Sequence, residues 1–250
     1  MRSLHLLFAL TLGLAVAHPL AAQVRTPAPG TRQISVQFGL SSSHGNRDSY
    51  SLSSSVEWNE NIGRFENDLD FDAHVTEAIG NNGGLSDEVT LDWTSRDALG
   101  SAPARRWFVL THLAGDRQDY AGLEFRAIAG AGLGRHVVEA THLRVTLEGG
   151  VAAAWEKPED GSTDVFPMPF AHGMMSWNLS KTANLNETLQ LQLNADDTGD
   201  VRVSSETGVS IRITESISLR PSVKVSWDNR PAAGASSLDV TTHTSLAFDF

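Results

Sequence analysis

Apolar and polar residues alternate along most of the chain, and the last stretch shows the pattern most completely. From Leu238 to Phe250, every second residue is apolar or threonine, and the residues between them are polar or small. A period of two is that of a β-strand whose two faces meet different surroundings. The same pattern predicts about 12 strands, near residues 33–40, 50–58, 64–73, 88–96, 107–113, 120–138, 141–156, 165–179, 189–194, 201–212, 217–227 and 238–250.

The segment at 165–179 fits the pattern least well. Pro167 and Pro169 lack the backbone N–H that a strand ladder uses, so proline in a sheet is ordinarily confined to edges or bulges. In the sixth segment, Gly130, Gly132 and Gly134 remove side chains from one face and allow the sheet to bend.

Two all-β folds produce such alternation. In a soluble β-sandwich the apolar face packs against a core, whereas in a transmembrane barrel it faces lipid. The chain ends on an aromatic residue, and most Trp and Tyr residues fall near the ends of predicted strands, as in the girdles of outer-membrane barrels. We therefore predict an antiparallel transmembrane β-barrel closed by the C-terminal strand, with a soluble exported β-sandwich binding protein as an alternative. The predicted girdle consists of Tyr50, Trp58, Trp93, Trp107, Tyr120, Trp155, Trp177, Trp227 and Phe250.

An even number of strands places both ends of the barrel domain on the periplasmic side. The outer loops are then expected near residues 44, 80, 117, 160, 199 and 233, and the inner turns near residues 60, 100, 140, 183 and 215. Several of the outer connections are longer and richer in Gly, Asn and Asp, which is the asymmetry typical of such barrels.

The start of the chain has the features of an export signal. Arg2 precedes an apolar run from Leu4 to Ala17, which is too short to span a bilayer and is followed by small residues. We predict a cleaved signal peptide at 1–22, with cleavage after Ala17 as the alternative, a periplasmic lead-in at 23–31 and one barrel domain at 32–250. The expected location is the bacterial outer membrane.

Charge and cysteine content narrow the partners. Residues 1–22 carry one charge, so the remaining chain has 18 basic and 30 acidic residues, a net charge of −12, which argues against nucleic acid. The chain has no cysteine for a disulfide or a thiolate metal site. We expect contacts with outer-membrane lipids and lipopolysaccharide, and recognition of the C-terminal strand by the barrel assembly machinery.

Several short motifs resemble one family when they are taken in order. They are Gly39 with the serines at 41–43 and Gly45-Asn46, then Arg106-Trp107, Arg126 with the glycines at 130–134, Asp228-Asn-Arg-Pro231, and Asp239 with the terminal Phe. The chain resembles the domain-of-unknown-function 481 family, the YdiY-like salt-induced outer-membrane proteins. It departs from the family at Asn46-Arg47, where Asn-Thr is expected. The resemblance implies a barrel and a link to salt or osmotic response, and it implies no catalytic residues.

The polar faces of the predicted strands carry many charges that should point into the lumen. They either attract cations, as acidic rings do in wide pores, or pair across a narrow interior, which we favour because the basic residues are numerous. The barrel is then structural or passes small solutes or ions. The candidate network consists of Arg64, Glu66, Asp68, Asp70, Asp72, Glu88, Asp92, Glu124, Arg126, Arg144, Glu148, Arg202, Glu206, Arg212, Arg220 and Lys224.

Catalysis is the second hypothesis. His243 and Ser245 have the His-x-Ser spacing of some membrane lipid hydrolases, but their parity turns both inward, and no third group for a base or an oxyanion site is evident. The remaining candidates are histidines scattered among strands, none at the spacing of paired metal ligands, so we expect neither a metal site nor a cofactor. These histidines are His44, His74, His112, His136 and His172.

Overall fold

The computed structural model describes residues 30–44, 49–78, 85–99, 106–118, 123–158, 161–231 and 236–250. The predicted signal peptide, residues 23–29 of the lead-in and Tyr120 lie outside these ranges. The described part of the chain forms strands β1 (Thr31–His44), β2 (Ser49–Ile62), β3 (Phe65–Ala78), β4 (Leu85–Ala98), β5 (Trp107–Gln118), β6 (Leu123–Glu139), β7 (Leu143–Pro158), β8 (Asp164–Asn178), β9 (Ala183–Leu193), β10 (Val201–Arg212), β11 (Ile217–Asp228) and β12 (Leu238–Asp249). No helix in these ranges has the length and hydropathy needed to cross a membrane.

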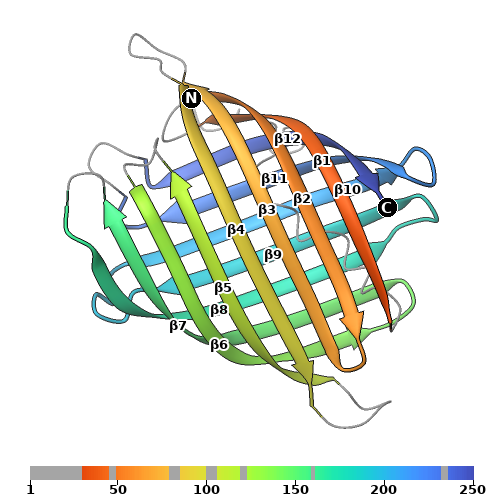
Figure 1. Ribbon diagram of the computed structural model, residues 1–250, viewed down its shortest axis with the longest axis horizontal. Helices are drawn as coiled ribbons and strands as arrows, with labels where there is room; N and C mark the ends of the chain where they lie inside the picture. The colour runs from red at the N-terminus through yellow and green to blue at the C-terminus, as the bar shows by residue number, and fades with distance from the viewer. Residues whose placement is uncertain are drawn as a thin grey trace, which may run out of the picture.

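The strands close into one barrel. Each strand pairs antiparallel with its sequence neighbours, and β12 pairs with β1, for example Val36 with Phe248 and Ser41 with His243. The strands are strongly tilted, so that β2, β3 and β4 cross the strands of the opposite wall in Figure 1. Closure confirms the predicted 12-stranded barrel and excludes the two-sheet sandwich.

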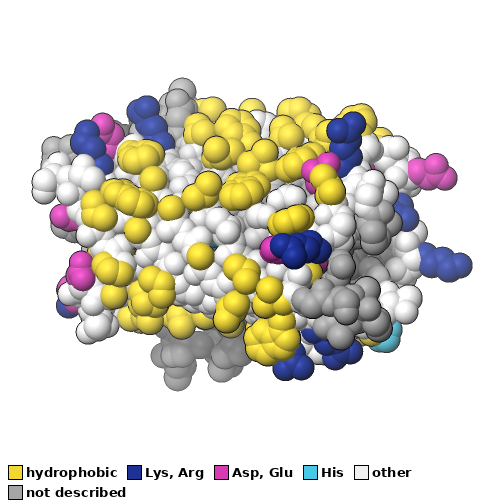
Figure 2. Space-filling model, turned by 60° about the horizontal axis from the view of Figure 1, so that its bottom comes forward, with side chains coloured by type: hydrophobic (Ala, Val, Ile, Leu, Met, Phe, Trp, Pro, Cys, Tyr) yellow, Lys and Arg dark blue, Asp and Glu magenta, His cyan; other side chains and the backbone are white. Residues whose placement is uncertain are grey.

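The outer surface of the barrel is hydrophobic because the apolar residues of each alternating strand are the ones that point away from the lumen. Large apolar side chains stay exposed on it, such as Phe38 at 56%, Leu40 at 67% and Leu189 at 51%. Figure 2 shows hydrophobic side chains spread over the middle of one face and charged side chains mostly toward the two ends. This distribution is the apolar band of a membrane barrel, for which lipid replaces the core that a soluble sheet would need.

Strand β8 forms despite its two prolines. Pro167 and Pro169 lie opposite Ala153 and Val151 of β7, whereas pairing with β9 begins only at Phe170. The prolines therefore lie beyond the end of one neighbouring ladder, where fewer N–H donors are required.

The connection between β2 and β3 is a tight turn at Gly63 and Arg64, a few residues later than predicted. Gly63 has a φ of 67°, in the left-handed region that glycine adopts without steric cost. We call the end of the barrel that carries this turn, together with the turns at 140–142, 179–182 and 213–216, the turn end. The opposite end, which includes the segment 194–200 between β9 and β10, is the loop end.

The inner surface has two different walls. Inward positions of β9 to β12 and of β1 to β4 are polar or small, whereas β5 to β8 contribute buried apolar side chains: Phe108, Leu110, Ile128, Ala152, Ala154, Phe166, Met168 and Phe170. Two of the rings lie over glycines, since a Cβ added at Gly134 would lie 2.2 Å from Phe108 and one added at Gly150 would lie 2.8 Å from Phe170. The missing side chains therefore let these rings fold down against the wall.

Candidate functional site

The site that the fold offers is the lumen, whose charged side chains form three ion-paired clusters. The first, which we call the seam clasp, lies where β12 closes on β1. Arg220 of β11 donates to both carboxylate oxygens of Glu57 on β2, at 3.2 and 3.0 Å, and to Asp249 Oδ1 on β12 at 3.0 Å. It also donates to Ser35 Oγ on β1 at 3.1 Å, while Gln37 donates to Glu57. The clasp thus joins the four strands around the closing seam.

The second cluster, the turn-end bridge, connects strands that are not neighbours. Arg96 of β4 donates through Nε to Glu148 Oε1 of β7 at 2.6 Å, and through Nη1 to Asp68 of β3. Nearby, Arg144 Nη2 of β7 lies 3.5 Å from Glu66 Oε1 of β3. Because β7 is separated from β3 and β4 by other strands, these ion pairs reach across the interior and narrow it.

The third cluster, the loop-end bridge, is built around Glu156 of β7. Arg202 of β10 donates to its two oxygens at 2.7 and 3.4 Å, so this contact also joins strands that are not neighbours. Arg126 of β6 lies 3.5 Å from Glu156 and 3.1 Å from Asp116. Charged groups therefore constrict the lumen at two levels, near its two ends.

Between the two bridges runs an acidic stripe. Asp70 of β3 lies opposite Glu57 on one side and Asp92 on the other in the strand register, so carboxylates follow one another across three strands. Asp72, in the same row of β3, is 4% exposed. On β11, Lys224 lies opposite Glu206 of β10, and Glu206 accepts a hydrogen bond from Ser222 at 3.1 Å.

Most of the predicted network lies on the inner wall, but two members do not. Arg64 is in the turn between β2 and β3, with its side chain 56% exposed, paired with Asp97 and lying over the ring of Phe65. The prediction for it was wrong because the strand begins one residue later than the alternation suggests. Glu124 pairs with Lys157 at the rim of the loop end, and both side chains are more than 40% exposed. Glu88 is buried inside the barrel.

The predicted network also lacks charged residues on which the clusters depend. They share the inward parity of the predicted set, and three of them, Glu57, Arg96 and Asp249, are on polar faces that the alternation identifies. The parity rule could have found them, whereas their partners depend on strand register. The missed residues are Glu57, Arg96, Asp116, Glu156, Asp200, Asp228 and Asp249.

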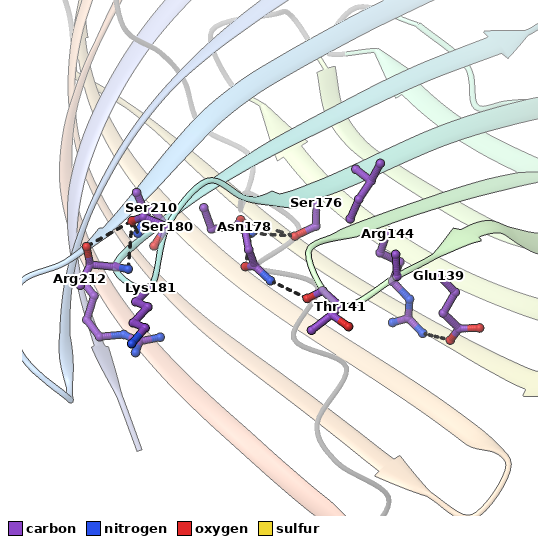
Figure 3. Close-up of a pocket in the computed structure, with 14 residues that line it drawn as sticks. Glu139, Thr141, Arg144, Ser176, Asn178, Ser180, Lys181, Ser210 and Arg212 are labelled. Carbon is purple, nitrogen blue, oxygen red and sulfur yellow. Dashed lines mark hydrogen bonds and ion pairs between the residues drawn. The ribbon is translucent and has the colours of Figure 1, made fainter.

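A cavity of about 650 Å³ opens at the turn end, between the turns 140–142 and 179–182. Figure 3 shows Arg144 and Glu139 at one side of it, Lys181 and Arg212 at the other, and Asn178 between them. Arg212, a member of the predicted network, thus lines this mouth and belongs to none of the three clusters.

The two candidate catalytic residues have separate partners. His243 Nε2 lies 3.0 Å from Ser53 Oγ, whereas Ser245 donates to Gln37 Oε1 at 3.0 Å and is 2% exposed. They therefore do not form a nucleophile–base pair in this arrangement. Among the described residues, no three His, Asp or Glu side chains converge in a way that could hold a metal ion.

The predicted girdle residues that the structure describes lie on the outer surface. The exposed fractions are 61% for Tyr50, 50% for Trp107, 43% for Trp177 and 40% for Trp227. Tyr50 and Trp227 are near the loop ends of their strands, and Trp107 and Trp177 are near the turn ends. This placement is that of residues which anchor a barrel at two interfaces.

Known barrels have the same fold. The NanC porin aligns with a TM-score of 0.57 at 8% identity over 85% of this chain and 98% of that one. The translocator domain of the autotransporter NalP from Neisseria meningitidis gives 0.57 at 14% identity over 92% and 93% of the two chains. An outer membrane channel from Pseudomonas putida F1 gives 0.57 at 13% identity over 94% and 100%. At these identities the likeness establishes the architecture of an outer-membrane barrel and no activity.

Sequence comparison leads to one family. The uncharacterized protein YdiY of Escherichia coli (strain K12) is 25% identical over 116 residues, which are 46% of this chain and 44% of that protein. The matched region therefore spans less than half the length of this relative. The family described as "Protein of unknown function, DUF481" matches residues 36–250, which include nearly all of the barrel, and the chain therefore belongs to the DUF481 family.

Proposed function

We propose that the protein is a non-enzymatic outer-membrane barrel that passes small ions or solutes through a narrow charged lumen, with its turn end toward the periplasm. The observation that carries this proposal is the pair of bridges across the interior, Arg96 to Glu148 and Arg202 to Glu156. Polar inward side chains line the wall of β9 to β12 and β1 to β4, and the bridges narrow the interior beside this wall. A barrel of this strand number is also narrower than the 16- to 18-stranded porins.

The acidic stripe gives the proposed path a preference for cations. Asp70 of β3 and Asp92 of β4 lie opposite each other on the wall between the two bridges, whereas Glu57 beside them is buried and paired with Arg220. Rings of acidic side chains favour cations in pores because they offset the loss of hydration. The expected permeant species are therefore small cations and neutral solutes rather than large anions.

Planar lipid bilayers test the proposal directly. Purified barrel should give small conductance steps, and the double variant Arg96→Gln, Glu148→Gln should give larger ones, because it removes charges that span the lumen. The matched control is Arg64→Gln, Asp97→Asn, which removes an exposed ion pair at the same end and should leave the conductance unchanged. An absence of conductance at every salt concentration, in both the native barrel and the bridge variant, would refute the channel and leave a structural role in the envelope.

Assembly is expected to depend on the last residue. Phe250 N donates to Ile34 O at 2.8 Å, which continues the closing ladder, while its side chain is 79% exposed and available for recognition. We infer that the barrel assembly machinery binds this end of the chain. Phe250→Ala should lower the amount of heat-modifiable barrel in the outer-membrane fraction, and an unchanged amount would argue against this role.

A further inference from the structure

The cavity at the turn end has a chemistry that differs from the rest of the lumen. Its lining carries three cations, Arg144, Lys181 and Arg212, and a single carboxylate, Glu139. The chain as a whole has a formal net charge of −11, and the acidic stripe lies deeper in the lumen. The charge of this cavity is therefore opposite to that of the chain as a whole.

Two of the three cations have no carboxylate partner among the residues that the structure describes. Arg144 Nη2 lies 3.5 Å from Glu66 and 3.4 Å from Glu139. In contrast, Lys181 and Arg212 pair with no carboxylate in the described part of the chain. Their backbones are held together, since Arg212 N donates to the carbonyl of Thr182 at 2.8 Å, and both side chains lie at the same side of the cavity in Figure 3.

Neutral polar groups form a fixed frame beside these cations. Asn184 Nδ2 donates to Ser176 Oγ and to Asn178 Oδ1, each at 3.0 Å, and Asn178 Nδ2 donates to Thr141 O at 3.3 Å. This chain of hydrogen bonds links β8, β9 and the turn after β6. It orients amide and hydroxyl groups toward the same space that Arg212 lines.

We propose that this cavity binds a small soluble anion, a carboxylate or phosphate carried on a hydroxylated solute, at the periplasmic mouth of the barrel. Lys181 and Arg212 bind the anionic group, and the Ser–Asn frame binds hydroxyl groups. The volume of about 650 Å³ is within the range of ordinary small-molecule sites. A lipid headgroup has the same chemistry. Arg212, Asn184 and Ser176 share the parity of the inner wall, however, so this part of the cavity faces the lumen and a soluble solute is favoured.

Calorimetric titration of the complete barrel in neutral, phosphate-free detergent micelles tests this inference, with inorganic phosphate and gluconate as probes. The native barrel should bind both, and Lys181→Gln, Arg212→Gln should bind about tenfold more weakly or worse, because charge-assisted contacts are lost. Arg230→Gln removes an exposed arginine outside the cavity and should bind normally. Asn184→Asp adds a negative charge within the frame and should also weaken binding, and heat-modifiable gel mobility verifies that each variant is folded.

The outcomes separate the possible explanations. No binding by the native barrel, or equal binding by the double variant, overturns the inference. Phosphate binding should be the same in bilayers of phosphatidylcholine alone and in bilayers that contain phosphatidylglycerol. If phosphatidylglycerol abolishes it, a lipid headgroup occupies the cavity, and the proposal of a soluble anion is overturned. Binding in micelles requires no conduction, so a failure of the proposed channel would leave this result unaffected.

Discussion

Replacing Arg220 by methionine should weaken the barrel at the seam where β12 meets β1. The substitution keeps an unbranched apolar stem and removes the guanidinium. Glu57, which is 0% exposed, then retains Gln37 as a hydrogen-bond donor but loses its counter-ion. Asp249, on the last strand, loses its ion pair as well.

The size of the effect follows from burial. The side chains of Arg220 and Glu57 are 2% and 0% exposed, so water cannot replace the lost contacts in the native state. Removing one partner of such a buried pair ordinarily costs about 3–5 kcal/mol of the free energy of unfolding, because a charge is left uncompensated. Arg64 and Asp97 form the comparison, since they are 56% and 30% exposed, and a surface pair contributes about 0–1 kcal/mol.

Urea unfolding in phospholipid vesicles, followed by tryptophan fluorescence, measures both variants. Arg220→Met should lower the free energy of unfolding several-fold more than Arg64→Met does. The double variant Arg220→Met, Glu57→Gln should recover part of the loss, because the buried carboxylate is then neutral. Equal stabilities of Arg220→Met and Arg64→Met, or a double variant weaker than Arg220→Met alone, would refute the role of the seam clasp.

Two further substitutions test contacts of the barrel wall. A Cβ added at Gly39 would lie 1.8 Å from His243 Nε2, so Gly39→Ala should lower the free energy of unfolding by about 1–3 kcal/mol. Adding His243→Ala to the same chain should restore the stability. Equal stability of Gly39→Ala and the native barrel would show that the His243 ring can move aside. Glu187 shares the outward face of Leu185 and Leu189 and accepts a hydrogen bond from Ser205 at 2.7 Å. Glu187→Gln keeps a hydrogen-bond acceptor and removes a charge from the lipid-facing surface, so it should raise the free energy of unfolding in vesicles by about 1 kcal/mol. A decrease would mean that the carboxylate does not lie in the hydrocarbon layer.

The alternation predicts the strands, their number and their outer faces because a residue that meets lipid must be apolar whatever its partners are. It does not predict the apolar inner wall of β5 to β8. Phe108 and Phe170 fall on faces that should be polar, and they fit only because Gly134 and Gly150 lie opposite them. Each glycine is on the strand next to its phenylalanine, so the space that it provides can be recognised only when the strand register is known.

The sequence also does not predict which residues pair in the lumen clusters. The strand register supplies these partners, and with them the net charge of each cluster. Parity indicates which side chains point inward, but it cannot tell that Arg96 reaches Glu148 across the barrel. In each cluster, carboxylates outnumber the cations that they contact: Arg220 meets Glu57 and Asp249, for example, and Arg202 meets Glu156, Asp200 and Asp228. Ion pairing therefore does not neutralise the lumen but leaves a negative excess at each constriction. Lys181 and Arg212 at the turn end have the opposite sign, so the same barrel should draw cations through its interior and hold anions at its mouth.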